Sequence, residues 1–367
     1  MATVFVRKAA YDYATLKPLV TGLLAALDQG LIRHDSKVLI KPNFLAPAAP
    51  EKAMITHPLI IRATVEYVLE KGGRPQVSDS PGMGSFDRIL REGGCAEALQ
   101  GLPVECRPLK ESVLVDVGAP FHRIEIAREA LHADVVINLP KLKTHTQMLL
   151  TLGVKNLFGC IVGLKKPQWH FRAGIDKERF AEVLVKIFAA VRPQMTLLDG
   201  ILAMEGQGPG RGGVPREMGV IMASTDAVSL DVAVCRMLGL KDDDLLTNRL
   251  AARAGLWAGD AVIDVEPPLI TDMKFPRMAP LVFGPKPLHR FMRKHLVQRP
   301  VCEPTLCVHC GECWRYCPAR AISRETRGLS FNYDTCIRCY CCIEVCPHGA
   351  LSARETPAGR LAWLFLR

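Results

Sequence analysis

Short apolar runs alternate with helical patterns through the first 265 residues of the chain. Short apolar runs indicate buried strands, and apolar residues three and four positions apart indicate amphipathic helices. The predicted strands are residues 3–6, 37–40, 76–78, 134–139, 195–198 and 220–223. The predicted helices are residues 16–27, 57–70, 178–191 and 227–237. Strands that alternate with helices predict an α/β fold, with a parallel or mixed sheet flanked by helices.

Polar side chains follow five of the predicted strands, at the point where each strand ends. Ligands of open α/β sheets bind outside the carboxyl ends of the strands, so we expect these side chains to converge on one edge of the sheet. The same residue types also cap loops and form turns, which is the alternative interpretation. The five groups are Lys41 with Asn43, Asp79 with Ser80, residues 141–145, Asp199, and residues 224–226.

The segment 141–170 is rich in cationic side chains and contains no Asp or Glu. Lysines beside a buried strand can bind a carboxylate or phosphate group, although lysines on an exposed loop would give the same pattern. The two histidines are candidates for metal binding or proton transfer, or for structural roles alone. The residues concerned are Lys141, Lys143, His145, Lys155, Lys165, Lys166 and His170.

Five acids and one glycine-rich segment are further candidates for chemistry in the α/β region. Each acid could supply a general base or bind a cation, and the sequence selects no pair among them. The glycine-rich segment 206–213 could cradle an anion through backbone N–H groups, or form a flexible lid. Its spacing matches neither the P-loop nor the dinucleotide-binding fingerprint. The five acids are Asp79, Asp199, Glu205, Asp226 and Asp231.

Ten of the fourteen cysteines lie between residues 302 and 346. Eight of them form two runs in which two, two and three residues separate successive cysteines, and each run ends in Cys-Pro. Bacterial ferredoxins have this spacing, and the fourth cysteine of each run ligates the cluster of the other run. A zinc site would instead use pairs of cysteines. The remaining two, Cys302 and Cys341, are expected not to be ligands.

The spacing therefore predicts two [4Fe–4S] clusters in a small ferredoxin-like α+β module. Cluster I is assigned to Cys307, Cys310, Cys313 and Cys346. Cluster II is assigned to Cys336, Cys339, Cys342 and Cys317. Residues 305–351 contain five arginines and four acidic residues, so the charge of the module is nearly balanced. This balance favours electron transfer within the chain or to a docked redox partner protein.

The sequence predicts four segments. They are an α/β domain at 1–265, a basic, proline-containing linker at 266–304, the ferredoxin-like module at 305–351, and a tail at 352–367. Residues 274–301 hold seven Lys or Arg and no acid, which fits a solvated linker on an acidic face, or contact with an acidic partner or anionic membrane. The apolar residues 361–366 are expected to dock on the body of the protein, with peripheral membrane contact as the alternative.

Composition narrows the class of protein. The net charge is +10, but the sequence contains no nucleic-acid-binding motif, so we expect no nucleic acid partner. Hydrophobic residues make up 49% of the chain, which excludes wholesale disorder. No apolar run reaches the length of a membrane span, and the first ten residues lack a signal-peptide pattern. The expected location is therefore the cytoplasm.

Several short motifs carry a resemblance to a known family. Residues 137–145 read Ile-Asn-Leu-Pro-Lys-Leu-Lys-Thr-His, and residues 153–159 read Gly-Val-Lys-Asn-Leu-Phe-Gly. With residues 41–43, 56–58, 199–201, 204–206 and 208–209, they resemble the DUF362 family, whose members have no known function and are often fused to a ferredoxin domain. The resemblance covers about residues 37–240 and implies a fusion of this kind, but no reaction.

A second resemblance concerns the order of His145, Lys155 and His170. With Gly159 and Gly163 between them, these residues are similar to the nickel-pincer lactate racemase family. That resemblance implies that Lys155 holds a cofactor and that His170 binds a metal. This chain lacks the doubled glycine that precedes the lysine in that family.

These observations favour an iron–sulfur oxidoreductase that passes single electrons to a small anionic substrate or cofactor at the strand ends. A further metal in the α/β domain is also consistent with them. The alternative is an electron-transfer partner, or a redox sensor, without a catalytic site. Candidate catalytic residues are Lys155, His145, His170, Asp199 and Glu205. Candidate residues that bind the anion or cofactor are Lys41, Asn43, Asp79, Lys141, Lys143 and Asn156.

Overall fold

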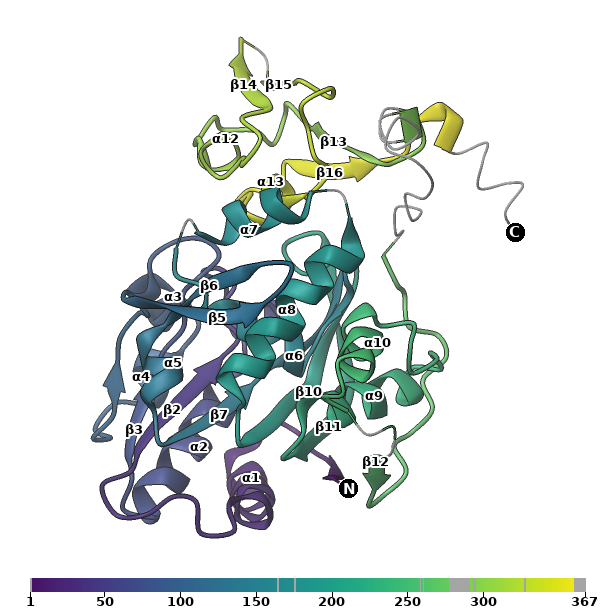
Figure 1. The fold of residues 1–367 in the computed structure, drawn as a ribbon. Coiled ribbons are helices and arrows are strands. Elements are labelled where there is room, and N and C mark those ends of the chain that lie inside the picture. Colours follow the sequence, from purple (N-terminus) through teal and green to yellow (C-terminus); the bar gives the residue numbers. More distant parts are fainter. Residues whose placement is uncertain are drawn as a thin grey trace.

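The computed structural model describes residues 2–163, 165–174, 176–257, 259, 261–276, 291–292, 295–326 and 328–359. Residues 277–290 and 293–294 of the basic linker and the apolar end of the tail lie outside the described residues, so the expectations for both stay predictions. A large α/β domain carries a small module on one end (Figure 1). None of the described helices has the length and apolar character needed to cross a membrane.

The described residues form a ten-stranded sheet in the α/β domain, with the main order β12-β1-β11-β10-β7-β2-β3-β4. Strands β10, β7, β2, β3 and β4 run parallel, and β11 runs antiparallel to β10. These strands are β1 (Ala2–Lys8), β2 (Lys37–Pro42), β3 (Arg74–Val77), β4 (Glu105–Cys106), β7 (Val135–Leu139), β10 (Met195–Gly206), β11 (Gly213–Ser224) and β12 (Ala261–Ile263). Two short strands, β8 (Lys141–His145) and β9 (Leu149–Thr151), pair beside β10. The mixed sheet confirms the predicted α/β class.

Helices cover both faces of this sheet (Figure 1). In β2, Val38 and Ile40 pack into one core with α1 (Tyr13–Asp28) and α2 (Pro58–Glu70). Leu39 points the other way, into a core with α8 (Lys177–Val191) and the β5–β6 hairpin. Because both faces are buried, the strands read as continuous apolar runs rather than alternating ones.

The other elements complete these layers. The hairpin is β5 (Ser112–Gly118) and β6 (His122–Ala127). The short helices are α3 (Phe86–Glu92), α4 (Cys95–Ala98), α5 (Arg128–His132), α6 (Gly153–Asn156), α7 (Lys165–Ala173) and α10 (Leu246–Arg253), with 3₁₀ turns at Pro50–Lys52 and Leu157–Cys160. Helix α9 (Ala227–Met237) begins at Asp226, whose carboxylate accepts hydrogen bonds from the backbone N–H groups of Val228 and Ser229.

Two expectations about strand ends were wrong. Residues 141–145, expected to follow the end of a strand, form a strand of their own, β8. Strand β10 continues through Asp199 to Gly206, with an irregular register after Gly200. Ser224, at the end of the antiparallel strand β11, pairs with Thr196 at the start of β10, which is level with Asn138 of β7 and, through it, with Lys41 of β2.

The small module is an α+β unit built from two similar halves. Strand β13 (Arg299–Cys302) pairs with β16 (Leu351–Arg354), and β14 (Ile322–Glu325) pairs with β15 (Gly328–Phe331). Two single-turn helices, α12 (Glu312–Arg315) and α13 (Cys341–Glu344), carry part of the cysteine runs. The module lies over α7 (Figure 1), so α13 faces the α/β domain.

Candidate functional site

A buried ion pair fixes the ends of β2 and β3. Lys41 Nζ lies 2.9 Å from Asp79 Oδ1, and the two residues are 0% and 3% exposed. Asp79 also accepts hydrogen bonds from the backbone N–H groups of Phe44 and Ser80. Gly159 packs so closely on this pair that a β-carbon there would overlap both Asp79 Oδ1 and Lys41. Lys41 is therefore ion-paired with Asp79, and the pair holds the backbone at the ends of β2 and β3 in place.

A chain of amide side chains links the strand ends to the next loop. Asn43 Nδ2 donates to Asn156 Oδ1 at 2.9 Å, and Asn156 Nδ2 donates to Asn138 Oδ1 at 2.8 Å. Asn43 Oδ1 accepts from Lys143 Nζ at 2.7 Å, and the carbonyl of Met54 accepts from the same ammonium at 2.8 Å. Burial, followed by the nearby charges of other lysines, holds the pKa of Lys143 well below its usual value. Lys143 is thus a buried, well-positioned donor.

Helix α6 is tied down by an acid from α9. Asp231 accepts the backbone N–H groups of Gly153 at 2.7 Å and Val154 at 3.1 Å. Burial raises the pKa of Asp231 to about 8, against the opposing effect of those two hydrogen bonds. Gly153 is needed there, because a β-carbon would stand 3.0 Å from the Asp231 carboxylate. This anchor sets the position of Lys155, two residues further along the helix.

Lys155 faces a pocket, and no described residue accepts a hydrogen bond from its ammonium. Burial lowers the pKa of Lys155, and the nearby Glu344 and Cys341 oppose that shift. Lys166 lies on the same side and donates to the carbonyl oxygen of Ser80. Burial lowers the pKa of Lys166 to about 8, which leaves it largely protonated at neutral pH.

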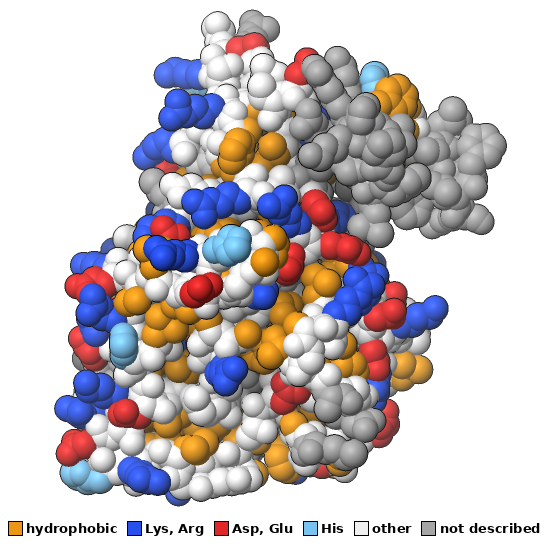
Figure 2. Space-filling view, in the orientation of Figure 1, with side chains coloured by type: hydrophobic (Ala, Val, Ile, Leu, Met, Phe, Trp, Pro, Cys, Tyr) orange, Lys and Arg blue, Asp and Glu red, His pale blue; other side chains and the backbone are white. Residues whose placement is uncertain are grey.

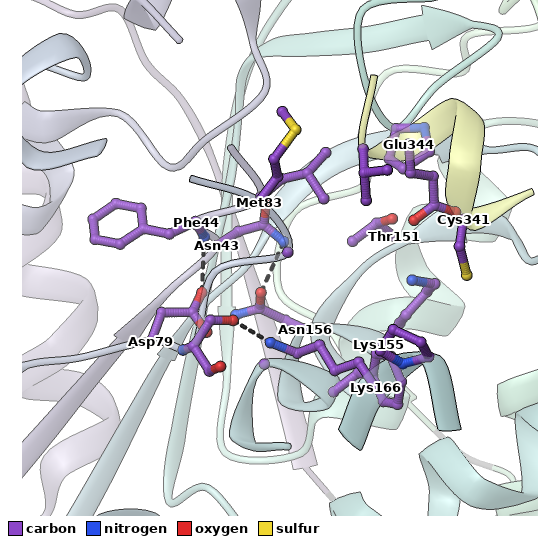
Figure 3. Close-up of a pocket in the computed structure, with 18 of the residues that line it drawn as sticks. Asn43, Phe44, Asp79, Met83, Thr151, Lys155, Asn156, Lys166, Cys341 and Glu344 are labelled. Carbon is purple, nitrogen blue, oxygen red and sulfur yellow. Dashed lines mark hydrogen bonds between the residues drawn. The ribbon is translucent and has the colours of Figure 1, made fainter. Parts of the chain in front are cut away.

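The pocket has a volume of about 110 Å³ and lies between the α/β domain and the small module. Figure 3 shows Lys155, Asn156 and Lys166 on one side, with Glu344 and Cys341 of α13 across from them. Its apolar lining includes Phe44, Met83, Phe158, Pro209, Tyr316 and Val345. The two parts of the chain thus build a single, partly cationic pocket between them.

His145 and Glu344 meet where the module touches the α/β domain. His145 Nδ1 accepts the N–H groups of Gln147 and Met148, so in the neutral imidazole the proton resides on Nε2. Nε2 lies 3.3 Å from Glu344 Oε1, but the two atoms are not aligned as a hydrogen bond. Burial lowers the pKa of His145 to about 4, so the imidazole is neutral at pH 7.

Glu344 is a carboxylate in a mostly buried position. Burial alone would raise its pKa, but His145, Lys155 and His170 around it lower the pKa to about 2. Lys155 and Glu344, from different domains, therefore lie on facing sides of the pocket.

His170 from α7 closes another side of the pocket. Its ring stacks on Phe180 with centroids 4.1 Å apart, and the residue is 5% exposed. Burial lowers the pKa of His170 to about 3. Its Nδ1 is buried and makes no hydrogen bond within the part of the chain that the structure describes. This neutral imidazole can offer one donor and one acceptor to a ligand.

Two of the expected site residues lie elsewhere, in a second buried cluster. Lys141 Nζ donates to Asp199 Oδ2 and to the Tyr11 hydroxyl, each at 2.7 Å. Tyr11 donates to Asp199 Oδ1 at 2.6 Å and stacks on the His57 ring with centroids 3.6 Å apart. Burial, with Asp199 beside it, raises the pKa of Tyr11 well above its usual value. Asp199 and Lys141 neutralise each other there and do not line the pocket.

Glu205 also lies away from the pocket. Its carboxylate pairs with Arg216 at 2.9 Å and accepts the backbone N–H of Lys274, so its pKa is lowered despite partial burial. The glycine-rich segment 206–213 packs against the module, with Gly210 beside the Glu344 carbonyl and Gly349 beside Arg211. Only Pro209 of that segment lines the pocket.

The cysteines fit iron–sulfur ligation. A cavity in the module is lined by Cys307, Cys310, Cys313 and Cys346, the four residues assigned to cluster I. Backbone N–H groups four residues after the last cysteine of each run donate to sulfur, at 3.3 Å from Ala321 to Cys317 and from Ala350 to Cys346.

The second set of cysteines is grouped in the same manner. Burial raises the pKa of the Cys342 thiol, and the charges of Cys339, Cys336 and Cys317 raise it further. Among the described residues, no three His, Cys, Asp or Glu side chains converge closely enough to hold a single metal ion.

Lys166, Cys341 and Glu344 line the pocket but were absent from the candidate site. Lys166 lay in the acid-free segment, which could have revealed it. Cys341 was considered a bystander, and it lines the pocket next to the ligand Cys342. Glu344 carried no sequence signal, because its role depends on how the module docks onto the α/β domain.

Comparisons with known proteins agree with this organisation. The model of a domain of unknown function, DUF362, matches residues 38–236, and a 4Fe-4S dicluster domain matches residues 306–350. Thylakoid-associated protein sll1697 of Synechocystis sp. is 36% identical over 306 residues, covering 81% of this chain and 95% of that protein. The match to a dicluster domain gives the chain an iron–sulfur electron-transfer role.

Two further similarities are partial. Pyruvate synthase subunit PorD of Thermotoga maritima is 42% identical over 59 residues, which cover 16% of this chain and 60% of that subunit. The lactate racemase apoprotein of Thermoanaerobacterium thermosaccharolyticum aligns with 53% of this chain and 50% of that one, at 12% identity and a TM-score of 0.36. A score that low supports no argument about the site.

Proposed function

The chain belongs to the DUF362 family and carries a 4Fe-4S dicluster domain, and from that premise we propose that it is an iron–sulfur oxidoreductase. Two [4Fe–4S] clusters would pass single electrons to a small anionic substrate or cofactor in the pocket between the domains. The observation that supports this most is the shared pocket wall. Lys155 and His170 of the α/β domain face Cys341 and Glu344 of the segment that holds Cys342.

The lysines would bind the anion. Lys155 has no hydrogen-bond acceptor among the described residues, and Lys166 stands on the same side of the pocket. An ammonium in a partly apolar, buried pocket attracts an anion more strongly than one in water, because the effective dielectric constant is lower. Basic side chains also gather on the surface where the module meets the α/β domain (Figure 2), which would steer anions toward this region.

The other side chains would orient the ligand and handle protons. His170 Nδ1 would donate or accept one hydrogen bond. The imidazole is not charged at neutral pH, so it can serve a ligand before and after its reduction. The apolar residues of the pocket would exclude water from the ligand.

Each cluster would be held by one group of four cysteines. When bound, the clusters would supply single electrons. Cys341 and Glu344 belong to the segment that holds cluster II, so that cluster would be the one beside the ligand. Cys310, a ligand of cluster I, is exposed, and a redox partner protein would deliver electrons there. PorD is named as a subunit of pyruvate synthase. The similarity to PorD supports the proposal that this chain exchanges electrons with a partner protein.

Anion binding by the anaerobically purified protein tests the proposal. We expect about eight irons per chain, and binding of inorganic phosphate or malonate by isothermal titration calorimetry. Lys155→Met should weaken binding at least tenfold. Lys165→Met is the matched control, because Lys165 donates to Ser112 and does not line the pocket. If the wild type binds neither anion, or if both variants bind as it does, the pocket is not a substrate site and an electron carrier or sensor is the better description.

A further inference from the structure

Lys155 stands between the pocket and helix α13. On one side is the pocket, where its ammonium has no hydrogen-bond acceptor among the described residues. On the other side is α13, whose Cys341 and Glu344 interact electrostatically with it. Cys341 is followed directly by Cys342, which is assigned to cluster II. A charge added to that cluster would therefore act on the same lysine that faces the ligand.

The charges around the pocket do not balance. Three buried or half-buried lysines line it, together with two carboxylates. Asp79 is taken up by Lys41 at 2.9 Å, and Glu344 is the remaining carboxylate. His145 and His170 are neutral at pH 7. The lysines are Lys143, Lys155 and Lys166.

We propose that a bound anion and the electron held by cluster II compete for the positive charge of Lys155. The inference rests on the proposed function and adds a regulation of the same site. The oxidised protein binds an anion more tightly than the reduced protein, and the bound anion makes the adjacent cluster harder to reduce. These two effects are equal in free energy, because coupling between two binding events is reciprocal. A substrate anion would thus bind before the electron arrives, and an anionic product would leave from the reduced protein.

The size of the effect follows from Coulomb's law. One extra unit charge about 10 Å from a monoanion, at an effective dielectric constant of about 20, changes its binding roughly tenfold. A tenfold ratio of dissociation constants corresponds to about 59 mV in the potential of a one-electron couple. The cluster away from the pocket should shift much less.

The test uses the full-length holoprotein and inorganic phosphate as the probe. The Kd is measured by equilibrium dialysis with the oxidised protein, and again after deazaflavin photoreduction, which adds no anionic reductant. The two cluster potentials are measured in parallel by EPR-monitored titration, with and without saturating phosphate. We expect a Kd about tenfold larger after reduction and a decrease in the potential of one cluster only. Equal Kd values with unchanged potentials overturn the inference and leave the proposed function standing, whereas no binding in either state overturns both.

Variants identify the shared group. In Lys155→Met without phosphate, one cluster potential should fall, because the nearby positive charge is gone. Lys155→Arg keeps the charge and should restore the wild-type potential, and Lys165→Met should leave both potentials unchanged. A wild-type potential in Lys155→Met would show that Lys155 is not the shared group.

Discussion

Removing the charge of Asp79 should destabilise the α/β domain strongly. In Asp79→Asn, Lys41 keeps its charge at a position that is 0% exposed, and its carboxylate partner at 2.9 Å is lost. The amide also replaces one of two oxygens that accept the N–H groups of Phe44 and Ser80. Breaking a buried ion pair from one side typically costs about 3–5 kcal/mol. Since domains have only about 5–15 kcal/mol of stability, much of the total would be lost.

The measurement is anaerobic urea unfolding followed by circular dichroism, with an exposed pair as the control. Asp35 lies 3.9 Å from Arg74, and both side chains are more than 60% exposed, so Asp35→Asn should change the free energy of unfolding by less than about 1 kcal/mol. The double variant Lys41→Met/Asp79→Asn should recover part of the loss, because it leaves no unpaired charge. If Asp79→Asn is as stable as Asp35→Asn, the pair does not hold the strand ends as described.

Three more predictions concern α9, the cysteine runs and the domain contact. The pKa of Asp231 is about 8 in the folded protein, above its usual value, so folding favours its protonated form and the wild type should lose stability as pH rises from about 4 to 8. Asp231→Asn should flatten that slope in urea titrations at several pH values, and an unchanged slope would refute the assignment. Cys317→Ser should remove the EPR signal of the cluster held by Cys336, rather than that of its own run; loss of the other signal would reverse the cross-ligation. Glu344→Gln should raise proteolysis between the domains and leave the iron content unchanged, and an unaltered cleavage rate would show that this contact does not dock the module.

The sequence predicted the layers of the α/β domain well, because a strand that is buried on both faces of the sheet has a continuous run of apolar residues. Val38, Leu39 and Ile40 are all apolar since neighbouring residues point into different cores. The cysteine runs predicted the iron–sulfur domain for a similar reason, because the spacing within each run is typical of ferredoxin ligands. Fold and cofactor class could thus be taken from patterns within short segments.

The pocket was harder to predict, because it depends on contacts between distant segments. Lys141 begins β8 and Asp199 lies within β10, and they pair with each other and with Tyr11, away from the pocket. Lys155 differs from them in having no hydrogen-bond acceptor among the described residues. The spacing of residues along the sequence does not predict that difference. Glu344 comes from a segment almost 190 residues beyond Lys155, and only the docking of the module brings them together.

The central claim is that an anion binds beside the cluster held by Cys336, Cys339, Cys342 and Cys317. Pulsed ³¹P ENDOR on the photoreduced protein with saturating phosphate tests it directly, because a hyperfine coupling reports a phosphorus nucleus close to the unpaired electron. The account predicts a ³¹P coupling to one cluster in the wild type and its loss in Lys155→Met. Phosphate that binds by dialysis but shows no coupling to either cluster would contradict it.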